Sequence, residues 1–167
     1  GTGGVSIFGL QFAAMAGARV IITSSSDEKL KRASDMGAWK TINSRDNPEW
    51  QEEVLKLTDG RGVDIALETG GGGTLPRTID AVRVGGTISL VGVLTGGEIN
   101  PVAVMRKSIR LQGVYVGSRG MFQDMNAAIA ASGMKPVISE RYGFDDARDA
   151  YHAMRAAAHF GKIVINM

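Results

Sequence analysis

The stretch GTGGVS at residues 1–6 decides how the rest of this sequence is interpreted. It leads at once into an amphipathic helix pattern, whose apolar face comprises Val5, Phe8, Phe12 and Met15 or Ala16. A glycine loop that opens a helix in this way normally follows a β-strand. No strand pattern precedes the loop, so we expect this sequence to be part of a longer protein that supplies the strand.

Beyond the first helix, short apolar runs alternate with amphipathic helix patterns. The apolar runs predict buried strands at residues 18–23, 40–43, 63–69, 87–93, 109–116 and 163–166. Apolar stripes at helical spacing predict helices around residues 30–36, 50–57, 75–82, 121–129 and 147–158, with a short one near residue 101. Residues 136–139 are expected to be extended.

Several local signals predict where these elements begin and end. Ser25 and Glu28 have the spacing of a capping box at the start of the second helix, and Gly37 is the expected residue beyond its end. Asn47-Pro48 has the pattern of an N-cap followed by the first helical residue. Gly85-Gly86 is expected to form the turn before the next strand.

The alternation of strands and helices predicts an α/β fold with a doubly wound parallel sheet of the Rossmann type. The strands are almost uniformly apolar, as expected when both faces of a sheet are covered. We expect a dinucleotide-binding domain over residues 1–134, truncated at its start and lacking its first strand. We place a boundary there because the strict alternation ends near residues 134–136, and residues 135–167 form the remaining segment.

Composition excludes several classes of protein. The 167 residues are 44% hydrophobic and 22% charged, with a formal net charge of +2, which argues against disorder and against a nucleic-acid partner. No run reaches the roughly 18 apolar residues of a membrane span. The absence of cysteine excludes disulfides and thiolate metal sites within these residues and is compatible with the cytoplasm. The 23 glycines are about twice the usual ~7%.

The clustered glycines indicate a binding site for a dinucleotide. Gly1-x-Gly3-x-x-Ser6 is the dinucleotide fingerprint with serine in place of its last glycine. The helix that follows would present free N–H groups and partial positive charge to the phosphates. Further glycines follow the predicted strands, at Gly70–Gly73, Gly92 and Gly117, at the edge where ligands of open α/β sheets lie. An unrelated glycine-rich turn is the alternative interpretation.

The residue after the second strand bears on the choice between NAD and NADP. NAD-dependent proteins commonly place Asp or Glu there, about 20 residues past the loop. This sequence has Ser24, with Lys29 and Arg45 nearby, so a 2′-phosphate would meet no repulsion and some positive charge. The pattern favours NADP, with NAD possible. Alternatively, the two cations are solvated surface charges and Ser25 only caps a helix.

Other residues give weaker signals. His152 and His159 lie seven residues apart without a carboxylate or cysteine at ligand spacing, so no metal site is predicted. Glu68 ends a strand beside the glycine run, where it could contact a ribose or a backbone amide. Tyr115 and Tyr151 are expected in the core. No catalytic residue is predicted, because no Ser-His-Asp or paired-carboxylate spacing occurs.

Taken together, the sequence resembles the cofactor-binding domain of the medium-chain dehydrogenase/reductase superfamily, which includes zinc-type alcohol dehydrogenases and quinone oxidoreductases. The resemblance covers essentially the whole chain. It is carried by GTGGVS, GARVIITSSSDEKLKRASDMGA, GVDIALETGGGGTLPRTIDAVRVGGTISLVGVL, IRLQGVYVGSRGMF and HFGKIVI. The resemblance implies the sheet order 3-2-1-4-5-6, with the first strand absent here. It also implies that residues 135–167 return toward an absent amino-terminal catalytic domain.

The resemblance also implies a set of cofactor-binding residues. The pyrophosphate would be held by Gly3, Gly4 and Val5. Ser24 with Lys29 would face the adenosine ribose or its phosphate, and Thr69 and Gly70 would lie near the adenine ribose. The nicotinamide would be held by main-chain groups of Val91, Val93, Val114 and Val116. The edge strand Ile109–Val116 would pair subunits into a homodimer or homotetramer.

The implied function is hydride transfer between NAD(P)H and a small alcohol or aldehyde, with this chain as the cofactor-binding part. Zinc, if used, would bind only in the absent amino-terminal domain. Three alternatives remain: a metal-free NADPH-dependent quinone or enone reductase, a non-catalytic NADPH-binding protein, and an S-adenosylmethionine-dependent transferase. The expected partner of the protein is a small-molecule substrate, with no nucleic acid and no membrane.

Overall fold

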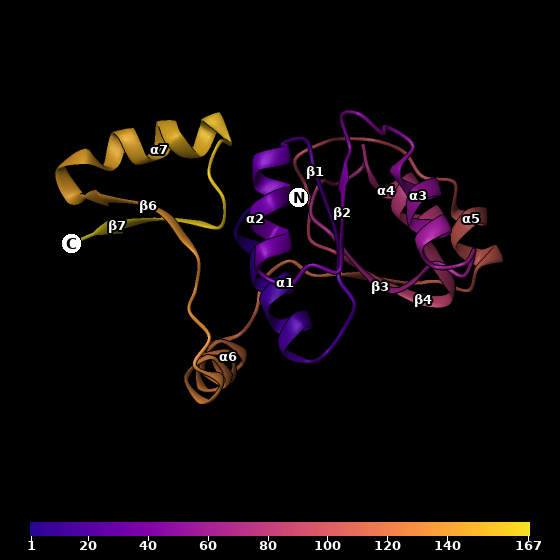
Figure 1. Cartoon of the computed structure of the whole chain (residues 1–167), viewed down its shortest axis with the longest axis horizontal. Helices are drawn as coiled ribbons and strands as arrows, with labels where there is room; N and C mark the ends of the chain where they lie inside the picture. The colour runs from indigo at the N-terminus through magenta and orange to yellow at the C-terminus, as the bar shows by residue number, and fades with distance from the viewer. The chain divides into compact units, whose positions relative to one another are not determined.

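The computed structural model describes residues 1–167 (Figure 1). Contacts between residues divide the chain into two compact units, one of Gly1–Thr41 with Gly120–Met167 and the other of Ile42–Arg119. Strands and helices alternate through most of the chain, and the registered strand pairs are parallel. The predicted α/β class with a parallel sheet is therefore confirmed. The predicted boundary at residue 134 stays a prediction.

The first unit contains both ends of the chain. Its amino-terminal part comprises α1 (Gly4–Met15), β1 (Ile21–Ser24) and α2 (Asp27–Asp35), and β1 pairs with β2 (Lys40–Asn43). Its carboxyl-terminal part comprises α6 (Arg119–Ser132), β6 (Ile138–Gly143), a short 3-10 turn (Phe144–Asp146), α7 (Ala147–Ala156) and β7 (Lys162–Asn166). Figure 1 shows α7 running alongside the β6–β7 pair.

One apolar cluster holds the first unit together. Its fully buried members are Ile7, Leu10, Ile22, Leu30, Ala33, Ala38 and Phe160. The predicted core face of α1 was wrong in part, because Val5 and Met15 are about half exposed, at 49% and 50%. The helix instead turns Ile7 and Leu10 inward, three residues apart on its buried face.

The ends of α2 show how local sequence sets this helix. The N-cap is Ser26, whose Oγ accepts a hydrogen bond from the Lys29 amide at 3.4 Å, so the predicted Ser25 capping box is wrong by one residue. The end of the helix is as predicted. Gly37 adopts a φ of +97°, and its amide and that of Ala38 bond to the carbonyls of Ser34 and Ala33, which is a Schellman motif.

The second unit is built on a three-stranded parallel sheet. Its elements are α3 (Trp50–Leu57), β3 (Val63–Glu68), α4 (Leu75–Ala81), β4 (Val82–Leu90), α5 (Pro101–Arg106) and β5 (Arg110–Gly113). The strand order is β3-β4-β5, and Glu68, Leu90 and Gly113 lie in register. The loops that follow the three strands therefore leave the sheet at one edge.

β1 and β3 belong to different hydrogen-bonded sheets. The hydrogen-bonded orders are β1-β2 and β3-β4-β5, with no pairing of β1 to β3. The predicted order 3-2-1-4-5-6, with its first strand absent, stays a prediction. β3 also exposes one face, because Ile65 and Leu67 alternate with the residues that pack on α4.

Several boundaries differ from the predictions. The predicted edge strand Ile109–Val116 is shorter in the structure, where β5 ends at Gly113. Gly85-Gly86 lies inside β4 as an irregularity in the register with β3, with Gly85 at a φ of +69°, and is not a turn before the strand. Helix α3 begins at Trp50 with Glu49 as its N-cap, two residues later than Asn47-Pro48 suggested. Of the extended segment expected at 136–139, only residues 138 and 139 lie in a strand, as the start of β6 (Ile138–Gly143).

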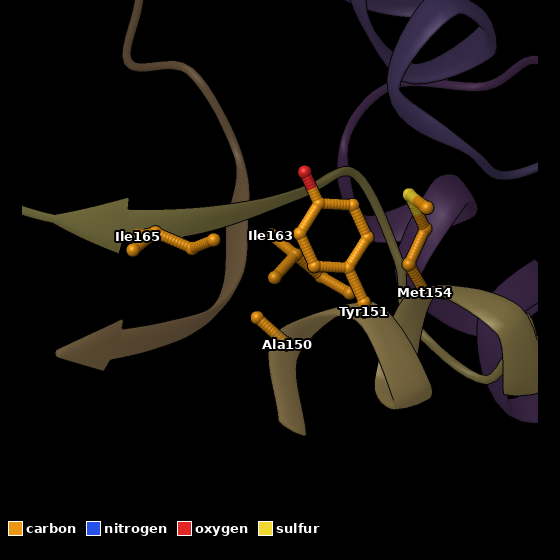
Figure 2. A pocket seen from close by; sticks show the side chains of 5 residues that line it. All are labelled: Ala150, Tyr151, Met154, Ile163 and Ile165. Atoms are coloured by element: carbon orange, nitrogen blue, oxygen red, sulfur yellow. The ribbon is translucent and has the colours of Figure 1, made fainter. Parts of the chain in front are cut away.

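The tyrosines predicted in the core are exposed. Tyr115 is 95% exposed and Tyr151 is 64% exposed, while Ala150 is the buried residue of α7. Figure 2 shows Tyr151 extending from α7 over β7, where its ring lines a shallow apolar hollow with Met154 and Ile163. None of the helices combines the length and apolar character needed to cross a bilayer.

Candidate functional site

The helix start that follows the glycine loop is open. Gly3 is the N-cap of α1, and no side chain caps this end of the helix. The backbone of Gly3 is extended, with φ at −75° and ψ at −180°, a conformation that any residue adopts. A Cβ atom on Gly3 would have no atom within 4 Å. Glycine here therefore leaves empty space beside the positive end of the helix dipole.

Gly161, near the carboxyl-terminal end of the chain, holds this helix start in place. The amide of Gly161 donates to the carbonyl of Thr2 at 3.0 Å, and Gly161 forms a parallel bridge with Gly3. Gly161 has a φ of +84°, and a Cβ atom on it would lie 2.5 Å from the Val137 carbonyl oxygen. The preceding Phe160 is 1% exposed within the apolar cluster of the unit. The segment that holds the helix start is therefore itself fixed by the apolar core.

The residue after Gly161 is a lysine, whose cation lies over the helix start. The side chain of Lys162 lies against Gly4, and its Nζ would be 3.3 Å from a Cβ atom on that glycine. Lys162 and Gly4 line a small pocket of about 120 Å³ with Met154, His159, Gly161 and Ile163. The Nδ1 atom of His159 is buried without a hydrogen-bond partner. Helix dipole and ammonium together suit an anion, such as a phosphate group.

The two residues predicted to face the adenosine ribose lie in the same unit. Ser24 ends β1 and is 9% exposed. Lys29 lies in the first turn of α2, and its Nζ donates to the carbonyl of Ala157 at 2.8 Å. Ala157 is the left-handed residue that ends α7, so the ammonium satisfies a carbonyl at the negative end of that helix. The predicted contact of Lys29 with a cofactor stays a prediction.

Six residues of the second unit were predicted to bind the cofactor, and all six lie just beyond the carboxyl ends of its strands. Thr69 and Gly70 follow β3, Val91 and Val93 follow β4, and Val114 and Val116 follow β5. Backbone hydrogen bonds extend the ladder beyond the strands, since the amides of Val91 and Val114 donate to the carbonyls of Glu68 and Leu90 at 2.9 Å each. Val93 and Val116 are 87% and 75% exposed, so this edge has an accessible apolar surface.

Two glycine-rich loops are joined at this edge. The hydroxyl of Thr95 accepts from the Gly73 amide at 2.8 Å and donates to the Gly70 carbonyl at 3.1 Å. The Gly72 amide donates to the Thr95 carbonyl at 3.0 Å. A Cβ atom on Gly92 would lie 2.5 Å from the Thr69 carbonyl oxygen. These glycines therefore let two backbones pack against each other.

Glu68 lies beneath these loops as a buried acceptor. It is 4% exposed, and its Oε1 accepts from the amides of Gly70 and Gly71 at 2.7 and 3.0 Å and from the Thr74 hydroxyl at 2.7 Å. Its Oε2 accepts from the Thr78 hydroxyl at 2.5 Å. Of the two contacts considered from sequence, the backbone amide is the one observed.

Sequence reasoning missed Lys162 as part of the site. The only sequence signal is a lysine directly after a glycine at the start of an apolar strand, and its neighbour Gly4 is 158 positions away. No group of three or more His, Cys, Asp or Glu side chains is arranged to hold a metal ion.

Known proteins resemble this chain over its full length. The sequence model of a family described as zinc-binding dehydrogenase matches residues 4–131. The chain belongs to the zinc-binding dehydrogenase family. It is 40% identical over 173 residues to a zinc-type alcohol dehydrogenase-like protein of Schizosaccharomyces pombe, covering 100% of this chain and 50% of that protein.

Solved structures similar to this chain agree with the family assignment. A protein of Sinorhizobium meliloti assigned as an alcohol dehydrogenase superimposes with a TM-score of 0.92 at 45% identity, covering 100% of this chain and 49% of the other. A mycobacterial protein complexed with NADPH gives a TM-score of 0.84 at 26% identity, covering 100% and 55%. The chain spans about half the length of the relatives it matches.

Proposed function

We propose that this chain binds a nicotinamide dinucleotide and serves hydride transfer between that cofactor and a small alcohol or aldehyde. The observation that carries the proposal is the uncapped start of α1 with Lys162 over it. Membership of a dehydrogenase family supports the reaction class. The chain matches only half of its relatives, so the groups that act on the substrate would lie in the other half of a longer protein.

The residues present fit the diphosphate of such a cofactor. The empty space beside Gly3 admits a phosphate group close to the backbone, where the amides of Gly4 and Val5 can donate to it. The ammonium of Lys162 would supply a charge-assisted hydrogen bond. Main-chain groups after β3, β4 and β5 would hold the ribose and the nicotinamide. When bound, the cofactor gives or accepts the hydride, and this chain orients it.

We propose NADP as the preferred cofactor, with NAD as the alternative. Ser24 carries no negative charge that would repel a 2′-phosphate. The mycobacterial relative is described as a complex with NADPH. Lys29 would join this contact only by exchanging its bond to the Ala157 carbonyl for one to the phosphate.

The residues of this chain do not fit a zinc site. It has no cysteine, and no cluster of nitrogen or oxygen ligands is arranged for a metal. A zinc ion that polarised the substrate would need ligands from outside these residues. The metal-free quinone or enone reductase therefore stays an alternative.

We propose that two copies pair through β5. This strand ends the order β3-β4-β5, so its outer edge has no partner strand in the chain. Unpaired edges of sheets are surfaces on which another chain can add strands. A homodimer in analytical ultracentrifugation that Leu111→Pro dissociates would support this pairing, and an unchanged mass for the variant would exclude it.

Fluorescence titration tests the cofactor proposal. NADPH and NADH are each added to the protein, and nicotinamide emission is followed to saturation. We expect saturable binding of both, tighter for NADPH, with no competition from S-adenosylmethionine. Absence of binding by both nucleotides would overturn the proposal, and competition by S-adenosylmethionine would favour the transferase.

A further inference from the structure

The carboxylate of Glu68 is buried and fully engaged by donors. Its two oxygens accept hydrogen bonds from two backbone amides and two hydroxyls, all of which lie in the second unit. No cation is among these partners. A buried carboxylate needs such donors, because burial removes the water that would otherwise hydrogen-bond to its charge. The donors of Glu68 therefore hold it in place, and it holds them.

The two carboxylate oxygens of Glu68 accept hydrogen bonds from different parts of the second unit. Oε1 binds the amides of Gly70 and Gly71, which form the loop after β3, and the hydroxyl of Thr74, where that loop enters α4. Oε2 binds only Thr78, one turn further along α4. One oxygen thus fixes the loop, and the other fixes the carboxylate to the helix.

The hydrogen bonds of Glu68 also connect to the loop after β4. Gly70, whose amide is held by Glu68, accepts at its carbonyl from the hydroxyl of Thr95. Thr95 in turn binds the amides of Gly72 and Gly73. The loops after β3 and β4 are therefore connected through hydrogen bonds to one buried carboxylate.

We propose that Glu68 is a positioning residue for the cofactor, which acts by holding both loops in their binding shape before the cofactor arrives. This inference rests on the proposed nicotinamide-binding function. In open α/β sheets the ligand lies where the strand order reverses, beyond the carboxyl ends of the strands. The loops connected to Glu68 follow the carboxyl ends of β3 and β4. Loops that are already ordered lose less conformational entropy on binding.

A matched pair of variants separates positioning from simple stability. Thr74→Val and Thr78→Val each remove one hydroxyl from Glu68, but from opposite oxygens. We expect both to lower the melting temperature. Only Thr74→Val should weaken NADPH binding, by about threefold, while Thr78→Val should stay within about twofold of the wild type. Glu68→Gln, which turns an amide donor toward the same donors, should weaken binding by about tenfold or more.

Hydrogen exchange of the full chain supplies a second readout that needs no cofactor. We expect the amides of Gly70 and Gly71 to exchange several-fold faster in Thr74→Val than in Thr78→Val. If the wild type binds NADPH and both threonine variants bind it equally well with equal exchange, the inference is overturned. If the wild type binds neither NADPH nor NADH, the proposed function fails instead. Glu68→Gln need not fold for these outcomes to decide.

Discussion

Replacing Lys162 with methionine should affect stability and binding in opposite directions. The ammonium lies over the first turn of α1, at the positive end of the helix dipole, where a cation is unfavourable. Methionine keeps an apolar stem beside Gly4 and removes the charge. The variant should therefore fold at least as well as the wild type and bind a phosphate-bearing cofactor less tightly.

The expected magnitudes follow from this geometry. Removing a cation from a helix N-terminus should stabilise the fold by about 0.3–1 kcal/mol, a rise in melting temperature of about 1–4 °C for a chain of this size. A hydrogen bond between charged groups contributes about 1.5–3 kcal/mol. Because Lys162 is exposed to solvent, the lower end applies, which is about a tenfold increase in the Kd for NADPH.

Differential scanning fluorimetry and NADPH fluorescence titration measure the two effects. The salt dependence of the Kd should also become shallower in Lys162→Met, since one cation no longer contacts the phosphates. Lys56→Met on α3, where the lysine is exposed and pairs only with Glu53, is the matched control and should change neither quantity appreciably. A Kd equal to that of the wild type would refute the assignment of this lysine to the phosphate site.

Three further changes test the packing and electrostatics. Phe160→Ala should lower the free energy of unfolding by about 3–5 kcal/mol in denaturant titrations, because the ring is 1% exposed in the core; a loss below 1 kcal/mol would contradict this. Lys107→Met should lower it by about 1–3 kcal/mol, since its ammonium binds three carbonyls at the end of α4 at 2.6–3.0 Å, and an unchanged melting temperature would show that water replaces it. Hydrogen bonds from Arg61, and to a smaller extent from Arg83, lower the pKa of Asp64 in the folded protein. The ionised carboxylate therefore stabilises the fold at neutral pH, and this stabilisation is lost as the pH falls below the pKa of Asp64 in the unfolded state. Thermal melts between pH 6 and pH 3 should therefore decline less for Asp64→Asn than for the wild type, and parallel declines would argue against the pairing.

The carboxyl-terminal hollow illustrates a limit of periodicity. The spacing of Tyr151 and Met154 correctly places them near one another on α7, yet both are more than half exposed. Helical spacing states which side chains share a face, whereas burial depends on what packs against that face. Ala150 is buried because β6 and β7 lie against its side of the helix.

Short-range features could be predicted from sequence because their partners lie within a few residues. β2 has the predicted bounds Lys40–Asn43, and Gly37 ends α2 as expected, since a left-handed residue after a helix favours glycine. The glycine loop before α1 and the alternation of elements were enough to predict the α/β fold. The error at Ser26 is of one residue, because three consecutive serines offer equally good caps.

Contacts between distant residues were decided only by the tertiary structure. Lys162 lies over Gly4 because the core holds Phe160 and the Gly161 amide binds Thr2, and no local pattern encodes that approach. Thr95 binds Gly70, 25 positions away, because β4 pairs with β3 and brings the two loops together. Local chain geometry sets where helices and strands form, whereas contacts between segments far apart in the sequence depend on which of them the core brings together.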